Sequence, residues 1–196
     1  MSDVMIIDDL VPKEIQDRIE HKFCKSNELN WFFHPTSCGE HDNPYWHYMK
    51  NPNVVEGPQF VHYMYDSKRG KTSDYLDDAL SIVNLLKQKY DDVKFDLHRI
   101  KANLQLQTKD SQPDKFCGVH RDFDFDHMVF LYYVNDSDGD TFLFDDINGE
   151  LKVKERISPK KGRIIVFDGS NLHASSIPTN SPYRCVFNID MDVIPK

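Results

Sequence analysis

The chain has 196 residues, of which 24 are Lys or Arg and 32 are Asp or Glu, giving a formal net charge of -8. A net negative surface repels phosphate backbones, so we expect no nucleic-acid partner. Of the 32 acidic residues, 25 are Asp, so a short motif that contains Asp arises readily by chance and needs support from its context.

The length predicts a single domain over residues 1–196, large enough to bury a core without disulfides. The longest apolar run, residues 128–134, is far shorter than the roughly 20 residues of a membrane helix, so no membrane span is expected. Residues 1–4 lack the pattern of a signal peptide. Cysteines stand at 24, 38, 117 and 185, without a Cys-x-x-Cys pair. Reduced thiols and a cytoplasmic location are therefore expected.

The first part of the chain predicts a short strand over residues 4–7 and a helix that begins near Pro12, with Ile15, Ile19 and Phe23 at helical spacing. Residues 34–59 contain several prolines and glycines and are expected to be mostly loop. A second helix is expected after Ser73, which can cap it. Its apolar stripe contains Leu76, Ala79, Leu80, Val83 and Leu86.

Beyond residue 90 the pattern changes to period two, with apolar and polar residues alternating over 100–107. Further short strands are expected at 127–134, 141–144, 151–157, 163–167 and 183–191. Turn signals separate them, which favours an antiparallel sandwich or barrel. The fold class is therefore mainly β with flanking helices (α+β), in which residues 1–93 form a helical and loop support and 94–192 the β core.

The β core contains His120-Arg121-Asp122, whose outer residues face the same way if the segment is extended. His173 follows the expected strand at 163–167, and Arg184 comes eleven residues later. Two His and one carboxylate on one side of a metal leave three open positions, the arrangement of non-haem Fe(II) oxygenases. Two positions suit a chelating 2-oxo acid and the third dioxygen. A guanidinium such as Arg184 suits the distal carboxylate of 2-oxoglutarate.

Residues 95–192 resemble the 2-oxoglutarate- and Fe(II)-dependent oxygenases, in their prolyl-4-hydroxylase-like branch. The resemblance rests on His120, Asp122, His173 and Arg184 in family order, on Leu131-Tyr132-Tyr133-Val134-Asn135, and on the turn Asp138-Gly139-Asp140-Thr141. It implies a double-stranded β-helix, or jelly roll, with N-terminal helices packed on one side. It also implies Fe(II) ligands at His120, Asp122 and His173, which would be the catalytic residues, and a 2-oxoglutarate site at Arg184 and Tyr133.

Some positions depart from the family pattern. Val186 stands where the family often has Ser, and Asp138 replaces the first Gly of a Gly-Gly turn. The family's Tyr in the strand before His-x-Asp is absent, so Asn103 or Gln105 could contact 2-oxoglutarate instead, and Asn103 is favoured. These departures affect the expected 2-oxoglutarate pocket and leave the expected metal ligands unchanged.

The implied activity couples oxidative decarboxylation of 2-oxoglutarate to hydroxylation of a C–H bond, with dioxygen as cosubstrate. A prolyl residue of a peptide or protein and a free amino acid or other small metabolite are the candidate substrates. The sequence does not define the oligomeric state. His127 and residues 34–72 are candidates for substrate contact.

Three alternatives stay open. The first is a jelly-roll metal- or ligand-binding protein without turnover, although the chain has no His-x-His of the cupin kind. The second is a cysteine hydrolase that uses Cys117 with a nearby His. The third is a zinc site, whose candidate ligands are His34, Cys38, His41 and His47.

Overall fold

The computed structural model describes residues 4–38, 44–109 and 111–196. Within them, strands predominate over two α-helices, α1 (Lys13–Glu20) and α2 (Leu76–Lys89). The large sheet contains, in spatial order, β1 (Val4–Ile7), β9 (Ile164–Asp168), β6 (Met128–Tyr133), β11 (Tyr183–Pro195), β5 (Val93–Leu106), β3 (Gln59–Asp66) and β2 (Phe32–His34), and β4 (Gly70–Lys71) pairs with β3. The small sheet contains β10 (Leu172–Ser175), β7 (Thr141–Ile147) and β8 (Glu150–Ile157).

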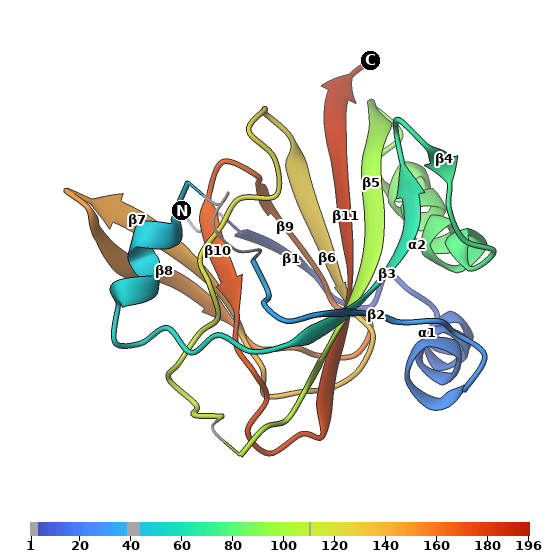
Figure 1. Cartoon of the computed structure of the whole chain (residues 1–196). Coiled ribbons are helices and arrows are strands. Elements are labelled where there is room, and N and C mark those ends of the chain that lie inside the picture. Colours follow the sequence, from blue (N-terminus) through green and yellow to red (C-terminus); the bar gives the residue numbers. More distant parts are fainter. Residues whose placement is uncertain (1–3, 39–43, 110) are drawn as a thin grey trace.

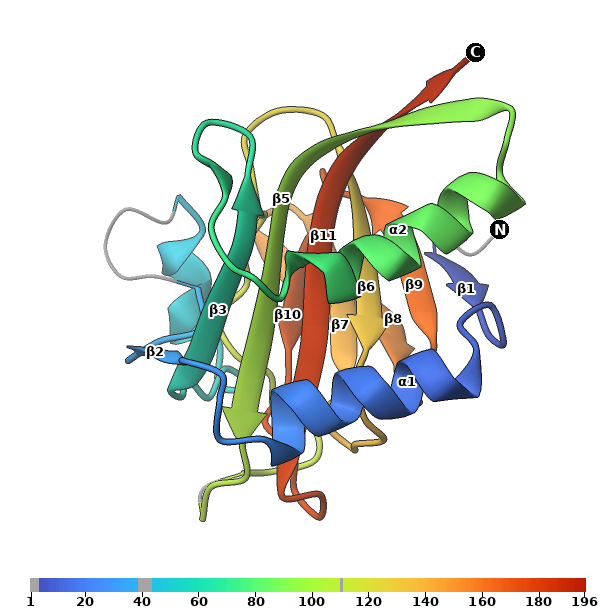
Figure 2. The same cartoon turned by 90° about the vertical axis from the view of Figure 1, so that its right-hand side faces the viewer.

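The molecule has three layers: the two helices, the large sheet and the small sheet (Figures 1 and 2). Figure 2 shows α1 and α2 lying across one face of the large sheet, with β7, β8 and β10 on the other side. The pairings in both sheets are antiparallel. One apolar core lies between the helices and the large sheet, and a second lies between the two sheets.

Strand β6 shows why the sequence contains an uninterrupted apolar run. Phe130 and Tyr132 face the helices and belong to the first core, whereas Val129, Leu131 and Tyr133 belong to the core between the sheets. Because successive side chains of a strand point to opposite faces, a strand covered on both faces is apolar at every position. The expected strand at 127–134 is therefore confirmed as a central strand of the large sheet.

Helix α1 begins after Pro12, as the sequence predicts, and continues into a π-helical turn over His21–Lys25. Ile19 and Phe23 are fully buried in the core between the helices and the large sheet. Within the described chain no helix combines the length and the apolar character needed to cross a membrane.

Helix α2 buries most of the predicted stripe, but its start differs from the prediction. The helix begins at Leu76, and Ser73 lies in the turn before it, where its Oγ accepts the N–H of Tyr75 at 3.0 Å. Buried Asp78 accepts hydrogen bonds from Arg18 (3.1 Å) and Lys22 (2.8 Å), which ties α2 to the α1 region. Ser73 therefore orders the approach to the helix and does not cap its first turn.

The sequence suggested that the β core begins at about residue 94, but the large sheet includes strands from earlier in the chain. Strand β3 pairs with β5 and β2 pairs with β3, so strands from the first third of the chain extend the large sheet. Strand β10 was also missed, because its four residues are too few for a clear alternation. In the expected loop at 34–59, the structure describes a short 3₁₀ helix, Trp46–Lys50, and residues 39–43 lie outside the described residues.

Candidate metal centre

The segment before β6 runs beside β10 and brings two of the predicted ligands together. The N–H of His120 donates to the carbonyl of His173 at 3.1 Å, and the N–H of His173 donates back at 3.0 Å. The N–H of Cys117 donates to Ser175 in the same ladder, at 2.7 Å. The two imidazole rings lie with their centroids 4.6 Å apart. Backbone pairing between residues 53 positions apart thus fixes both rings side by side.

In both rings Nδ1 forms a hydrogen bond with a backbone carbonyl. The partner of His120 is Gly118 at 3.0 Å, and the partner of His173 is Asn171 at 3.1 Å. A carbonyl only accepts, so Nδ1 carries the proton, and a neutral ring then keeps its lone pair on Nε2. Burial, together with the neighbouring His173, lowers the pKa of His120 to about 4. Near neutral pH His120 is therefore an uncharged ring with a free Nε2, the form that binds a metal.

The carboxylate of Asp122 completes the group. Its Oδ2 lies 3.3 Å from Nε2 of His173 and accepts a hydrogen bond from Asn188 at 3.0 Å. Its Oδ1 accepts from Arg99 and, at 3.4 Å, from Lys101. Burial acts to raise the pKa of Asp122, but Lys101 and Arg99 hold it well below its usual range. The carboxylate is therefore ionised although its side chain is only 2% exposed.

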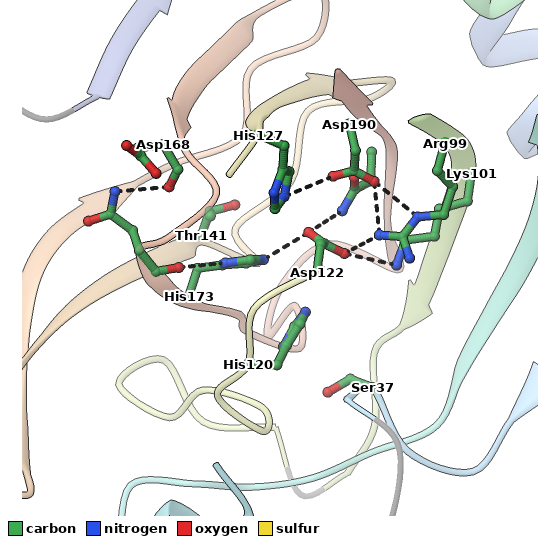
Figure 3. Close-up of polar contacts among 12 residues, drawn as sticks. Ser37, Arg99, Lys101, His120, Asp122, His127, Thr141, Asp168, His173 and Asp190 are labelled. Atoms are coloured by element: carbon green, nitrogen blue, oxygen red, sulfur yellow. Dashed lines mark hydrogen bonds and ion pairs between the residues drawn. The ribbon is translucent and has the colours of Figure 1, made fainter. Parts of the chain in front are cut away.

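His120, Asp122 and His173 offer ligand atoms that all lie within 4.8 Å of one another, and no second such group exists among the described residues (Figure 3). Nε2 of His173 and the Asp122 oxygen face each other, and both bear lone pairs when the ring is neutral. A metal cation between them would be bound by both lone pairs. The residues thus fit a two-His, one-carboxylate metal site.

Two side chains that the sequence analysis did not single out hold Asp122 in place. Arg99 on β5 lies opposite Asp190 on β11, and its Nε donates to that carboxylate at 3.0 Å. Arg99 and Lys101 are two apart on β5, so they share a face and both reach Asp122 (Figure 3). Burial, with Asp122 nearby, raises the pKa of Asp190 to about 6. The strand alternation placed Lys101 on the polar face, but the pairing register that brings it to Asp122 is non-local.

His127 was a candidate for substrate contact, and the structure places it in the interior. Its side chain is fully buried, with Nε2 3.9 Å from Oδ1 of Asp190 and Nδ1 2.8 Å from the carbonyl of Phe125. A Cβ at Gly169 would come within 2.3 Å of the His127 ring. His127 therefore packs closely on the turn after β9 and supports the strand that carries Asp190.

Arg184 lies on β11, at the other end of the β5–β11 face from Arg99. It is buried and has only neutral partners among the described residues. Its Nε donates to the carbonyl of Gly139 at 2.7 Å, and its Nη2 donates to Oγ1 of Thr141 at 2.9 Å. The hydroxyl of Tyr133 donates to the same Thr141 oxygen at 2.8 Å. Burial lowers the pKa of Arg184. The structure thus brings Arg184 and Tyr133 together through Thr141, whose role as the link was not predicted.

Asn103 and Gln105 both face this region, so the structure keeps both alternatives. Gln105 lies opposite Arg184 in the β5–β11 register, with Oε1 3.5 Å from Nη1 of Arg184. Its amide nitrogen lies 3.4 Å from the sulfur of Cys117. The side-chain oxygen of Asn103 is buried and has no hydrogen-bond partner within the described ranges. A buried polar atom without a partner is costly, which is consistent with Asn103 facing a ligand.

Asp138, the departure from the family's Gly-Gly turn, anchors the loop before β11. Its carboxylate accepts the N–H groups of Thr179 (3.1 Å), Asn180 (2.8 Å) and Ser181 (2.9 Å). Burial acts to raise its pKa, but these donors and the Thr179 hydroxyl lower it overall. The substitution thus fixes the chain that leads into Arg184.

Two hollows meet at the triad, the group formed by His120, Asp122 and His173. A cavity of about 40 Å³ extends from His120 and His173 to Arg184, and an open groove of about 260 Å³ lies on the outer side. Both are lined by Ser37, Gln59, Lys101 and His120. The inner cavity has room for a few water molecules, so a larger ligand requires side chains of its wall to move.

The alternative sites receive no support from the geometry. Burial, with Glu56 nearby, raises the pKa of the Cys117 thiol to about 12, which disfavours a nucleophilic thiolate. Of the zinc candidates, His41 lies outside the described residues. Cys38 contacts Glu56 at 3.3 Å and His47 contacts the carbonyl of Pro44, and the described residues show no metal-binding group there.

No protein-family model matches the sequence, and no curated protein matches it significantly. Solved structures do match. A 2OG-Fe(II) oxygenase family oxidoreductase from Burkholderia pseudomallei is 14% identical, with a TM-score of 0.63 over 96% of this chain and 85% of that one. The chain has the fold of these proteins.

Two further structures show how varied that fold is in function. A prolyl hydroxylase from Trichoplax adhaerens, in complex with a peptide fragment of hypoxia inducible factor, matches with 14% identity and a TM-score of 0.58 over 98% of this chain and 84% of that one. The α-ketoglutarate-dependent epimerase SnoN of nogalamycin biosynthesis matches with 10% identity and a TM-score of 0.59 over 97% and 77%. The shared fold therefore leaves the substrate and the reaction to be argued from the site.

Proposed function

We propose that this protein is a 2-oxoglutarate- and Fe(II)-dependent dioxygenase. The observation that carries the proposal is the convergence of His120, Asp122 and His173 at one end of a cavity whose other end is formed by buried Arg184. The likeness of the fold to structures of this enzyme class supports it. The mainly β architecture would then be a double-stranded β-helix, with residues 94–192 as the catalytic core and residues 1–93 as its support within a single domain.

His120, Asp122 and His173 would hold Fe(II), and their backbone and carboxylate contacts keep the three donor atoms oriented before metal arrives. Arg184 would bind the distal carboxylate of 2-oxoglutarate, with Tyr133 and Thr141 beside it and Asn103 at the wall. Bound Fe(II) would supply the redox chemistry that couples decarboxylation of 2-oxoglutarate to the use of dioxygen on a C–H bond.

The protein's own contribution is orientation and exclusion of water. Arg184 and Thr141 would fix one end of the cosubstrate, and a metal held by His120, Asp122 and His173 would fix the other. A hydroxylation of a small molecule or of a peptide residue such as prolyl is the reaction we propose. A relative on the same scaffold that binds metal and ligand without turnover is the competing function.

Spectroscopy followed by turnover tests the proposal. Fe(II) and 2-oxoglutarate are added anaerobically to the protein, and the visible metal-to-ligand charge-transfer band is recorded. Oxygen is then admitted and succinate is measured. We expect both the band and succinate. Folded protein without the band contradicts the proposal, and a band without succinate, with a range of substrates present, favours the non-catalytic alternative.

A further inference from the structure

The outer groove beside the triad contains an excess of positive charge. Among the described residues, its lining includes Arg99, Lys101 and Arg121, against a single carboxylate, Asp122. Adding the buried Asp190 behind Arg99 still leaves three cations to two carboxylates. If Asp122 binds a metal ion, its negative charge is balanced by that ion, and the positive charge of the groove lining is then less compensated. A groove of this kind, in a chain whose net charge is -8, is a local feature that calls for an anionic occupant.

The three cations differ in how well they are already paired. Arg99 contacts both Asp122 and Asp190, so its charge is balanced. Lys101 has a single contact among the described residues, 3.4 Å from Asp122, although its side chain is only 15% exposed. Burial lowers the pKa of Lys101, and its ammonium form has three N–H donors, of which two are left for another partner. It lines both the inner cavity and the outer groove, next to His120.

Arg121 offers a second charge at the mouth of the groove. Its side chain is exposed, and its guanidinium lies 5.4 Å from the centre of the Tyr45 ring. It takes part in no ion pair with the described residues, unlike Arg99. Lys101, which is largely buried, and Arg121, which is exposed, therefore both present donors to the same groove.

We propose that this groove binds a small substrate through a carboxylate, with Lys101 as the anchor and Arg121 as a second contact. The inference rests on the proposed function and names its substrate class, a small carboxylic acid. An ammonium and a guanidinium both form charge-assisted hydrogen bonds with a carboxylate. The volume of about 260 Å³ is small for a ligand site, which favours a compact molecule. Anchoring at Lys101 places the rest of the substrate beside the triad.

The test compares acids with their own amides on the same protein. The anaerobic complex with Fe(II) and 2-oxoglutarate is titrated with the common L-amino acids and with short alkanoic and hydroxy acids, each beside its primary amide. Perturbation of the charge-transfer band reports binding, and succinate after admission of oxygen reports turnover. We expect at least one acid to perturb the band and support succinate formation. Its amide should bind about tenfold or more weakly, because a charge-assisted hydrogen bond is lost.

Variants assign the effect to the groove. Lys101→Met is expected to weaken the response to the acid by about tenfold or more and to leave the response to its amide nearly unchanged, so that the preference for the acid is lost. Arg121→Gln, which does not contact a metal ligand through its side chain, should weaken the response less. Lys152→Met, at an exposed position on β8, is the matched control and should behave as the unaltered protein.

Several results would overturn the inference. Equal binding of acid and amide would show that the groove does not recognise a carboxylate. A charge-transfer band that no acid perturbs would show the same. A response of the band to inorganic phosphate, without a response to carboxylic acids, would contradict a small carboxylic acid as the substrate class. If Lys101→Met weakens 2-oxoglutarate binding or abolishes the band in folded protein, Lys101 serves the metal or cosubstrate and not the substrate. Absence of the band in the unaltered protein is a different failure, that of the dioxygenase proposal itself.

Discussion

Half-buried Arg99 and buried Arg184, at opposite ends of one β5–β11 face, have contrasting surroundings. Arg99 pairs with the carboxylates of Asp122 and Asp190, whereas the partners of Arg184 in the described part of the chain are a carbonyl, a hydroxyl and an amide oxygen. Burying a cation without a counter-charge is unfavourable. The difference indicates that Arg99 is a structural residue that positions a metal ligand, and that Arg184 is held ready for an anion from outside the chain.

The largest effect is expected from His173→Ala, at the metal end. Loss of an outer-shell partner alone lowers metal affinity about 10–100-fold, so loss of a ligand should lower Fe(II) affinity by more than about a hundredfold. Succinate formation should disappear with it. Equilibrium metal binding and the turnover assay measure both. His47→Ala, at an exposed position of the 3₁₀ helix, is the control. Retained Fe(II) affinity in His173→Ala would show that the metal lies elsewhere.

The two arginines should differ in their contribution to stability. Arg99→Met leaves two buried carboxylates without their shared partner, and we expect the free energy of unfolding to fall by about 3–5 kcal/mol. Arg184→Met removes an uncompensated cation, so its change should be within about 1 kcal/mol of zero. Urea unfolding of the metal-free proteins at neutral pH compares them. Equal losses in the two variants would remove the contrast between the two ends.

Asp190 gives the metal end a distinct pH dependence. Its pKa in the folded protein, about 6, exceeds the ordinary value of 3.8, so its stabilising contribution is present below about pH 4 and is lost as the pH rises through 6. Asp190→Asn should remove this loss, which amounts to roughly 1–3 kcal/mol. Unfolding free energies of the metal-free proteins at pH 4 and 7 measure it. The same pH slope in protein and variant would mean that Asp190 does not titrate in this range.

The smallest effects are expected at the wall of the cavity. Replacing one amide that donates to 2-oxoglutarate should raise its Kd by about three- to tenfold. We expect Asn103→Leu to show this increase and Gln105→Leu to show less, because the side chain of Gln105 is already engaged with Cys117 and Arg184. Binding titrations of the two variants decide between these positions. A larger effect for Gln105→Leu would reverse the assignment.

The sequence predicted the central β strands and the residues that meet at the triad, because these depend on local alternation and on the order of motifs. The strand β3 was missed, since buried His62 and Gln59 interrupt its apolar pattern. Lys101 and Arg99 looked like an ordinary polar face. Only the pairing of β5 with β11, and the return of the loop before β6, bring them to Asp122. Contacts set by register between distant strands are not visible in the pattern of one strand.

The contrast between the arginines leads to one direct test. Arg184→Met and the unaltered protein are loaded with Fe(II) anaerobically, and 2-oxoglutarate binding is measured by calorimetric titration, with the exposed Arg69→Met as control. The predicted result is a loss of 2-oxoglutarate affinity of at least about tenfold in Arg184→Met, with Fe(II) affinity unchanged. An Arg184→Met protein that binds 2-oxoglutarate as tightly as the unaltered chain would contradict the account.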